Sequence, residues 1–183
     1  KEFTTLGNLE TSIRKLELKN TVLDGEVCIV DENGNEDFQG IIKEIKRKDH
    51  TIQNPYYYMF DQLTMEEFTS KTSTRTFKQR LDGLTVKLND IDSQYFSVLP
   101  QYRSDDTVFA EMIKQSKDGG WEGLMLRKDA PYQGKRSSDI LKVKSFHDAE
   151  YIVVDVENSI NRVIVEGREV EEEMLKNVVI EHK

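Results

Sequence analysis

The stretch WEGLMLRKDAPYQGKRSSDILKVKSFHDAEY, from Trp121 to Tyr151, places a carboxylate, a basic loop and two lysines within one short segment. Glu122 opens a short apolar run that ends before the turn at Pro131. Because this run is shorter than an ordinary helix and is flanked by turn residues, it predicts a strand. Lys142 and Lys144 alternate with apolar residues, which predicts a second strand with both ammonium groups on one face.

Two lysines that point the same way repel each other unless an anion lies between or opposite their charges, and a phosphate is the obvious anion. The alternative is a solvated strand face, since lysine also protects exposed sheet edges. The carboxylate of Glu122 and the basic residues Lys135 and Arg136 lie close to the pair in the sequence, which favours a binding site.

A second group of carboxylates, Asp24 and Glu26, lies two residues apart in the apolar segment 21–30. This spacing puts both on one face of a strand, where such a pair is most often exposed to solvent. Segment 54–63 is an aromatic strand that includes Phe60, and aromatic strand residues most often belong to a core. From the residues alone, both segments therefore have an ordinary structural explanation.

Several of these segments also resemble known motifs. Residues 122–127 and 141–144 resemble the fourth and fifth motifs of the covalent nucleotidyltransferases, the superfamily of ATP-dependent polynucleotide ligases and mRNA capping enzymes. Residues 23–27, LDGEV, resemble the third motif, whose glutamate faces the nucleotide and its metal. The segments GKRSS at 134–138 and FHDAE at 146–150 resemble small ATP-dependent DNA ligases of viral, phage and bacterial kind more than capping enzymes or RNA ligases.

The resemblance implies an enzyme that forms a covalent lysyl-AMP from ATP, passes AMP to a DNA 5′-phosphate, and seals the nick with release of AMP. Lys142 and Lys144 would hold the α-phosphate as catalytic residues. Glu26 and Glu122 would face the nucleotide and bind Mg²⁺ or its waters. Phe60, which precedes the matching aspartate, would stack on the purine.

The same resemblance assigns Lys135 and Arg136 to DNA contacts, with ATP and nicked duplex DNA as partners. It implies a full-length monomer that acts in DNA replication, repair or recombination. The family's nucleophilic lysine sits in a Lys-x-Asp-Gly tetrapeptide, which does not occur in these 183 residues. We therefore expect a fragment that is inactive in self-adenylation. Three alternatives stay open: an RNA ligase, an mRNA capping guanylyltransferase, and a non-catalytic nucleotide- or DNA-binding module.

The expected fold is α+β. A partial nucleotidyltransferase (adenylation) domain, ATP-grasp-like with antiparallel sheets flanked by helices, would span residues 1–145, and a truncated start of an OB-fold β-barrel would span 146–183. Hydrophobic periodicity predicts helices over 9–18, 35–49, 74–88 and 105–117, and strands over 21–30, 54–63, 95–100, 151–156, 162–165 and 177–180. We expect one cleft between the sheets to gather Glu26, Phe60, Glu122, Lys142 and Lys144.

The composition is that of a globular protein in water, with 37% hydrophobic and 33% charged residues. A formal net charge of −8 is unusual for a DNA-binding chain, but basic residues gather in 121–146 and acidic ones in 157–173. No run approaches the ~20 apolar residues of a membrane span. The single cysteine, Cys28, cannot form an internal disulfide, which favours a reducing, cytoplasmic compartment.

Overall fold

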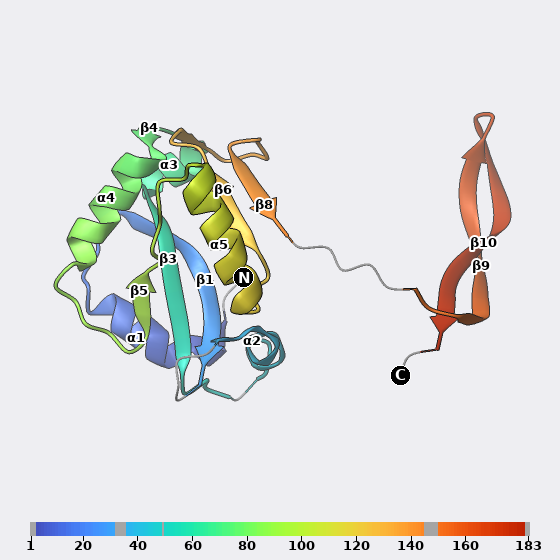
Figure 1. The fold of residues 1–183 in the computed structure, drawn as a ribbon, viewed down its shortest axis with the longest axis horizontal. Helices are drawn as coiled ribbons and strands as arrows, with labels where there is room; N and C mark the ends of the chain where they lie inside the picture. Colours follow the sequence, from blue (N-terminus) through green and yellow to red (C-terminus); the bar gives the residue numbers. More distant parts are fainter. Residues whose placement is uncertain (1–2, 32–35, 49, 145–149, 182–183) are drawn as a thin grey trace. The chain divides into compact units, whose positions relative to one another are not determined.

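The computed structural model describes residues 3–31, 36–48, 50–144 and 150–181 (Figure 1). The chain divides into two compact units, Lys1–Lys144 and Ser145–Lys183, and each is described here by itself. The domain boundary that we expected between residues 145 and 146 lies outside the described residues.

A four-stranded sheet forms the centre of the first unit, in the order β2-β1-β3-β5. β1 (Thr21–Val30) and β3 (Pro55–Thr64), whose β-branched and aromatic residues predicted strands, pair antiparallel along most of their length. β2 (Glu36–Asp37) extends one edge, and β5 (Phe96–Val98) pairs in parallel with β3 at the other. The expected strands over 21–30, 54–63 and 95–100 are therefore confirmed.

The hydrophobic core lies on one face of this sheet, where α1 (Gly7–Arg14) and α4 (Phe77–Leu88) cover β3 (Figure 1). Leu23 and Val27 of β1 pack against this core. Because side chains alternate along a strand, Asp24 and Glu26 belong to the opposite face. That face is on the side of the sheet where Figure 1 shows β6 and β8. The buried core residues are Leu9, Met59, Leu84, Leu88 and Phe96.

The segment 74–88, which we predicted as one helix, begins as a strand. β4 (Thr72–Thr76) follows α3 (Met65–Ser70) and pairs with β7 (Pro131–Gln133), and α4 starts only after it. Thr76 caps α4, since its side chain accepts from the backbone of Gln79 while the Gln79 side chain accepts from the backbone of Thr76. α4 continues through Gly83, where a Cβ would lie 2.6 Å from Nε2 of Gln62.

The remaining helices of the first unit are near their expected positions. The predicted helix over 9–18 is shorter than expected, because α1 ends at Arg14 and Glu17 has a positive φ of 50°. α2 (Phe38–Glu44) lies within the expected 35–49, and η1 (Thr4–Leu6) precedes α1. α5 (Asp106–Asp118) is confirmed, but its apolar positions are half-buried rather than buried.

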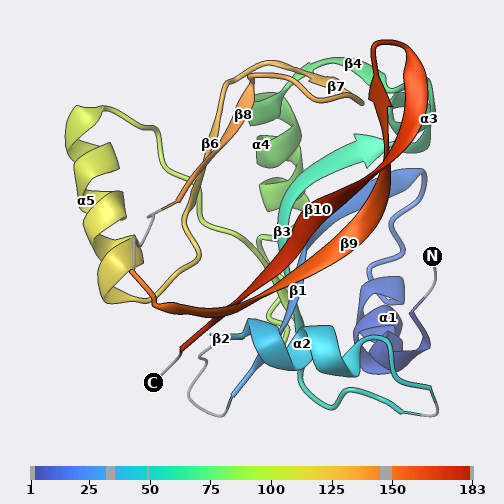
Figure 2. The same cartoon turned by 90° about the vertical axis from the view of Figure 1, so that its right-hand side faces the viewer.

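The second unit is an antiparallel hairpin of β9 (Val153–Val165) and β10 (Arg168–Ile180), which Figure 2 shows as a long twisted ribbon. Glu166 and Gly167 form the turn with φ values of 50° and 76°. The expected strands over 151–156 and 162–165 are parts of one strand, β9, and the expected strand over 177–180 is the end of β10. Both strands run through their polar residues, because a strand exposed on both faces can carry polar side chains at no cost of burial.

Candidate functional site

A two-stranded ribbon of β6 (Leu124–Arg127) and β8 (Ile140–Val143) carries the central stretch of the sequence. Met125 lies opposite Lys142 in this antiparallel ribbon. Gly123 has a φ of 151°, and a Cβ there would lie 2.2 Å from the carbonyl oxygen of Val143. The glycine therefore stands where the two backbones come closest, directly after Glu122.

The two lysines of the stretch converge on one carboxylate oxygen. Nζ of Lys142 lies 2.9 Å from Oε1 of Glu122, and Nζ of Lys144 lies 2.6 Å from the same atom. The prediction that both ammonium groups share a face is confirmed. All three side chains are exposed to solvent, so the cluster is open to a ligand from outside.

This cluster changes how its members bind protons. Hydrogen bonds from Lys144 and then Lys142 lower the pKa of Glu122 to about 2. The Glu122 carboxylate in turn raises the pKa of Lys144. At neutral pH the site therefore carries two positive charges and one negative charge, a net positive charge that suits an anion.

Phe60 lies at a β-bulge in β3. The register of β1 and β3 shifts so that Asp24 faces Asp61 and Gly25 faces Met59, and Phe60 is the extra residue between them. A bulge re-aims the side chain that it carries. The guanidinium carbon of Arg127 lies 4.9 Å from the centre of the Phe60 ring, so this ring is in contact with the end of β6.

A buried ion pair lies next to this contact. Asp61 is 4% exposed and accepts two hydrogen bonds of 2.9 Å from Nε and Nη2 of Arg80, which is also 4% exposed. Nη1 of Arg127 lies 3.6 Å from Oδ2 of the same aspartate. Burial lowers the pKa of Arg127, and the charge of Asp61 opposes this shift. Every buried side-chain polar atom of the described residues has a hydrogen-bond partner.

Glu26 lies on β1, opposite Tyr58 in the register of the sheet, and its side chain is exposed. Burial raises the pKa of Tyr58 to about 12, so that this phenol stays neutral. The contacts of the described residues link Glu122, Lys142 and Lys144 to one another, and Phe60 to the same ribbon through Arg127. They do not link Glu26 to that ribbon, so its place in the cleft stays a prediction.

Lys135 and Arg136 line a cavity of about 260 Å³ beside the buried ion pair. The cavity also takes in Asp24, Asp61, Phe77, Arg80, Arg127, Lys128, Ala130, Pro131, Tyr132, Gln133, Ser137, Asp139 and Ile140. More basic than acidic side chains line it, and both Lys135 and Arg136 are exposed. The basic loop and Arg127 thus line the same cavity.

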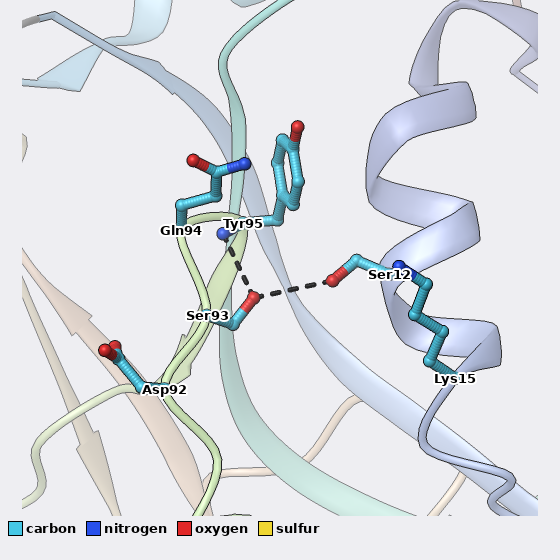
Figure 3. Close-up of a pocket in the computed structure, with 6 residues that line it drawn as sticks. All are labelled: Ser12, Lys15, Asp92, Ser93, Gln94 and Tyr95. Atoms are coloured by element: carbon cyan, nitrogen blue, oxygen red, sulfur yellow. Dashed lines mark hydrogen bonds between the residues drawn. The ribbon is translucent and has the colours of Figure 1, made fainter.

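A second, open groove lies between the end of α1 and the loop before β5 (Figure 3). Its volume is about 460 Å³, and Figure 3 shows Lys15 and Ser12 on one side and Asp92, Ser93, Gln94 and Tyr95 on the other. Oγ of Ser93 accepts a hydrogen bond of 3.2 Å from the backbone of Tyr95. None of the predicted site residues lines this groove.

Within the described ranges, no three His, Cys, Asp or Glu side chains gather as a ready metal site. Mg²⁺ is usually held by one or two carboxylates together with the phosphates of a nucleotide, so such a gathering is not required. Glu26 and Glu122 are exposed carboxylates with the hard oxygen atoms that this ion prefers, and they fit it on these grounds. No helix of the described residues has the length and apolar character to cross a bilayer.

Three features of the site were not predicted from the sequence: the contacts of Arg127, the place of Met125 beside Lys142, and the buried pair of Asp61 with Arg80. Met125 is 55% exposed and lies on the same face of the ribbon as Lys142, which the two-residue period of β6 and β8 could have revealed. Arg127 ends the EGLMLR segment, but nothing in the sequence pairs it with the rings of Phe60 and Phe77. The Asp61–Arg80 pair likewise joins two different elements.

Comparisons with known proteins give the family of this chain. The family model described as ATP dependent DNA ligase domain matches residues 3–144. The chain belongs to the ATP-dependent DNA ligase domain family. The matched range contains every predicted site residue of this ligase domain. A search of curated proteins found no match.

Solved structures show where the fold of this ligase domain recurs. The structure named Pmar-Lig_PreS3 has a TM-score of 0.75 and 23% identity, over 94% of this chain and 45% of the other. Pmar-Lig_Pre. has a TM-score of 0.71 and 22% identity, with the same shares. The ATP-dependent DNA ligase from bacteriophage T7 in complex with ATP has a TM-score of 0.51 and 18% identity, over 93% and 64%.

These similarities establish the fold of the chain. It is a mixed α/β arrangement with a curled sheet, similar to the nucleotidyltransferase domains of ligases, as the sequence predicted. The chain spans about half the length of the first two structures that it matches, 45% in each case.

Proposed function

We propose that this chain is part of an ATP-dependent DNA ligase and that its β6–β8 ribbon binds the phosphates of ATP. The observation that carries the proposal is the convergence of Lys142 and Lys144 on Glu122, within the range that the ligase family model matches. Two ammonium groups held 2.9 and 2.6 Å from one oxygen can also hold a phosphate oxygen, which carries the same kind of charge.

In the proposed reaction, a lysine amine attacks the α-phosphorus of ATP, a phosphorus–nitrogen bond forms and pyrophosphate leaves. AMP then passes from the lysine to a DNA 5′-phosphate, and the 3′-hydroxyl of the nick displaces AMP. Phosphoryl transfer depends mostly on positioning and on charge stabilisation. In this proposal Lys142 and Lys144 supply both, because their ammonium groups converge on one oxygen position, which an oxygen of the α-phosphate would take.

Glu122 keeps the lysine pair in place before the nucleotide arrives. A phosphate that binds the lysines competes with this carboxylate for the same donors, and Glu122 is then available to a cation. Mg²⁺ would be held by Glu122 and Glu26 with the phosphates, and it would supply charge neutralisation at the phosphate oxygens.

Phe60 provides the stacking surface for the purine in this proposal. One face of its ring lies against the guanidinium of Arg127, so a base would stack on the other face. Stacking on an aromatic side chain contributes roughly 1 to 3 kcal/mol per base. Phe60 on β3 would then hold one end of the nucleotide, and Lys142 on β8 with Lys144 just after it would hold the other.

DNA would contact the basic loop at Lys135 and Arg136, whose exposed side chains suit the phosphate backbone of nicked duplex DNA. We further propose that the β9–β10 hairpin begins an OB-fold, and that the protein acts as a monomer in the cytoplasm. The match to a DNA ligase family model favours this substrate over those of RNA ligases and capping enzymes.

The test is nick sealing by the protein that contains residues 1–183. It is incubated with ATP, Mg²⁺ and duplex DNA that carries one 5′-phosphorylated nick, and the strands are separated on a denaturing gel. We expect a sealed strand that depends on ATP. A protein that binds ATP and nicked DNA without sealing the nick would be a non-catalytic module, and this result would overturn the proposal.

A further inference from the structure

Arg127 lies between two aromatic rings that come from different elements. Its guanidinium carbon is 4.9 Å from the centre of the Phe60 ring and 4.8 Å from the centre of the Phe77 ring. Its side chain is 14% exposed. A planar guanidinium can stack on an aromatic ring with each of its faces, and both distances lie within the range of a cation–π contact.

The position of this guanidinium is fixed by charge as well as by the rings. Oδ2 of Asp61 lies 3.6 Å from Nη1 of Arg127. The carboxylate itself is held by two hydrogen bonds of 2.9 Å from Arg80, and both partners are buried. Arg80 also donates a bond of 2.7 Å to the carbonyl oxygen of Arg75. The Arg127 side chain therefore pairs with an aspartate whose own position is fixed by Arg80.

Arg127 also belongs to the ribbon that carries the lysine pair. It is the last residue of β6 and lies opposite Ile140 of β8, two residues before Lys142. Phe60 lies at the bulge of β3, in the central sheet. The contact of Arg127 with Phe60 thus joins the ribbon to the strand that carries the proposed stacking ring.

We infer that Arg127 is a positioning residue, which fixes the Phe60 ring relative to Lys142 and Lys144 and so sets the affinity of the site for the base of a nucleotide. This inference rests on the proposed function. Arg127 acts through Phe60 and does not touch the nucleotide. Its loss should weaken binding of the base and leave binding of the phosphates, which the lysines hold, nearly unchanged.

Lysine is the informative replacement at this position. It keeps the positive charge next to Asp61, but a compact ammonium group cannot lie flat between two rings. The ring of Phe60 would then lose its support on one face and turn more freely about its side-chain bonds. A base that stacks on it would have to order the ring first, which lowers affinity.

The experiment compares two ligands by isothermal titration calorimetry with Mg²⁺ present: ATP, which has a base, and inorganic triphosphate, which has none. In Arg127→Lys we expect affinity for ATP to fall about fivefold or more, and affinity for triphosphate to change less than about twofold. Arg14→Lys is the control, because Arg14 of α1 is also an arginine that pairs with a carboxylate, that of Glu10. It should leave both affinities unchanged.

A double-mutant cycle then tests whether Arg127 acts through Phe60. Phe60→Leu alone should weaken ATP binding, and Arg127→Lys should add little to it, because the ring that it positions is already absent. Fully additive effects on ATP binding would overturn the inference. An equal loss of ATP and triphosphate affinity in Arg127→Lys would also overturn it, since that result would indicate a general loss of structure.

Phe77→Leu covers the case in which Arg127→Lys does not fold. It removes the second ring of the sandwich from a position on α4 and should lower ATP affinity in the same direction, again without an effect on triphosphate. Unchanged ATP affinity in Phe77→Leu would then count against the inference. If the wild-type protein binds neither ligand, the proposed function fails together with the inference. If it binds ATP and neither variant changes the affinity, only the inference is overturned.

Discussion

Lys144 donates a hydrogen bond of 2.6 Å from Nζ to Oε1 of Glu122, across a separation of 22 residues in the chain. Glu122 lies just before β6 and Lys144 just after β8, so the contact closes one end of the ribbon. Lys142 adds a second contact to the same oxygen at 2.9 Å. The protein therefore holds both ammonium groups at one carboxylate oxygen, the position that a phosphate oxygen would take in the proposed site.

Removal of either lysine side chain should slow adenylation from ATP and leave the fold intact. In Lys142→Ala and Lys144→Ala we expect adenylation from ATP to fall on the order of 100-fold, because each loses a charge-assisted contact to the phosphate. Both side chains are exposed, so thermal unfolding should change little. The measurement is transfer of radiolabel from ATP to the protein that contains this chain.

Lys114→Ala is the matched control for this experiment, because Lys114 is an exposed lysine of α5 that pairs with Asp118 at 3.2 Å. It should label like the wild type. Near-normal labelling of both Lys142→Ala and Lys144→Ala would contradict the assignment of the phosphate site to the β6–β8 ribbon.

The Glu122 carboxylate should stay ionised down to an unusually low pH. Its pKa is about 2 in the folded protein, below the ordinary 4.5, because Lys144 and Lys142 hydrogen-bond to the charged carboxylate. The contact is therefore complete above about pH 4.5, and it is lost as the pH falls toward 2. An NMR titration of the side-chain carboxyl carbon should show this, and in Lys144→Ala the midpoint should rise. A midpoint near 4.5 in the wild type would mean that the lysines do not hold Glu122 in solution.

Glu67 should make stability depend on pH. Its pKa is lowered to about 2, chiefly by the hydrogen bond from Arg75. In this bond Nε of Arg75 donates to Oε1 of Glu67 over 2.8 Å. Glu67 therefore stabilises the fold above its ordinary pKa of 4.5, and this contribution is lost as the pH falls toward 2. With screening by solvent taken into account, we expect about 1 to 2 kcal/mol.

Glu67→Gln tests this contribution, because glutamine can still accept the capping hydrogen bond from the backbone of Thr64 but carries no charge. In urea unfolding at pH 7 the variant should be less stable than the wild type, and the difference should shrink at pH 3. Glu10→Gln, which alters an exposed pair with Arg14, should show little effect at either pH. A difference for Glu67→Gln that is the same at both pH values would contradict the prediction.

The core prediction concerns Leu84, which is fully buried on α4 with 0% exposure. Leu84→Ala should lower the free energy of unfolding by about 2 to 5 kcal/mol, because it removes buried apolar surface and leaves a cavity against Met59. Val86→Ala lies on the same helix at 78% exposure and should have almost no effect. Equal effects of the two substitutions in denaturant unfolding would argue against the packing of α4 on the sheet.

Local patterns in the sequence were enough to predict β1, β3 and the shared face of the two lysines. β1 and β3 are rich in β-branched and aromatic residues, and the two-residue period of β8 puts Lys142 and Lys144 on one face. The sequence predicted only that Glu122 lies near the two lysines. Their contact depends on the antiparallel pairing of β6 and β8, which the sequence pattern does not give.

Contacts between distant elements could not be read from those patterns. The pair of Arg80 with Asp61 joins α4 to β3, and Arg127 reaches Phe60 only because the ribbon and the central sheet are packed together. The start of α4 was misplaced for a related reason. Residues 72–76 form a strand through pairing with β7, a tertiary interaction that overrides the helical spacing of the segment.

The 183-residue chain itself should form no covalent adenylate. A lysyl-adenylate requires an amine placed within about 3 to 3.5 Å of the α-phosphorus and in line with the leaving pyrophosphate. In the proposed site Lys142 and Lys144 would hold the phosphate charge from one side, and both amines contact Glu122. An amine that holds a phosphate oxygen from beside the path of the leaving group cannot also attack the phosphorus from behind it.

The purified chain, incubated with radiolabelled ATP and Mg²⁺ and then precipitated with acid, should carry no bound label. A parallel measurement of ATP binding shows whether a chain without label still binds ATP. Weaker binding by Lys142→Ala in that measurement would indicate that the lysine pair contacts the phosphates of ATP. Stoichiometric acid-resistant label would mean that a lysine of these 183 residues is the nucleophile. Loss of that label in Lys142→Ala or Lys144→Ala alone would then identify which amine attacks, and it would replace the phosphate-holding role proposed for that residue.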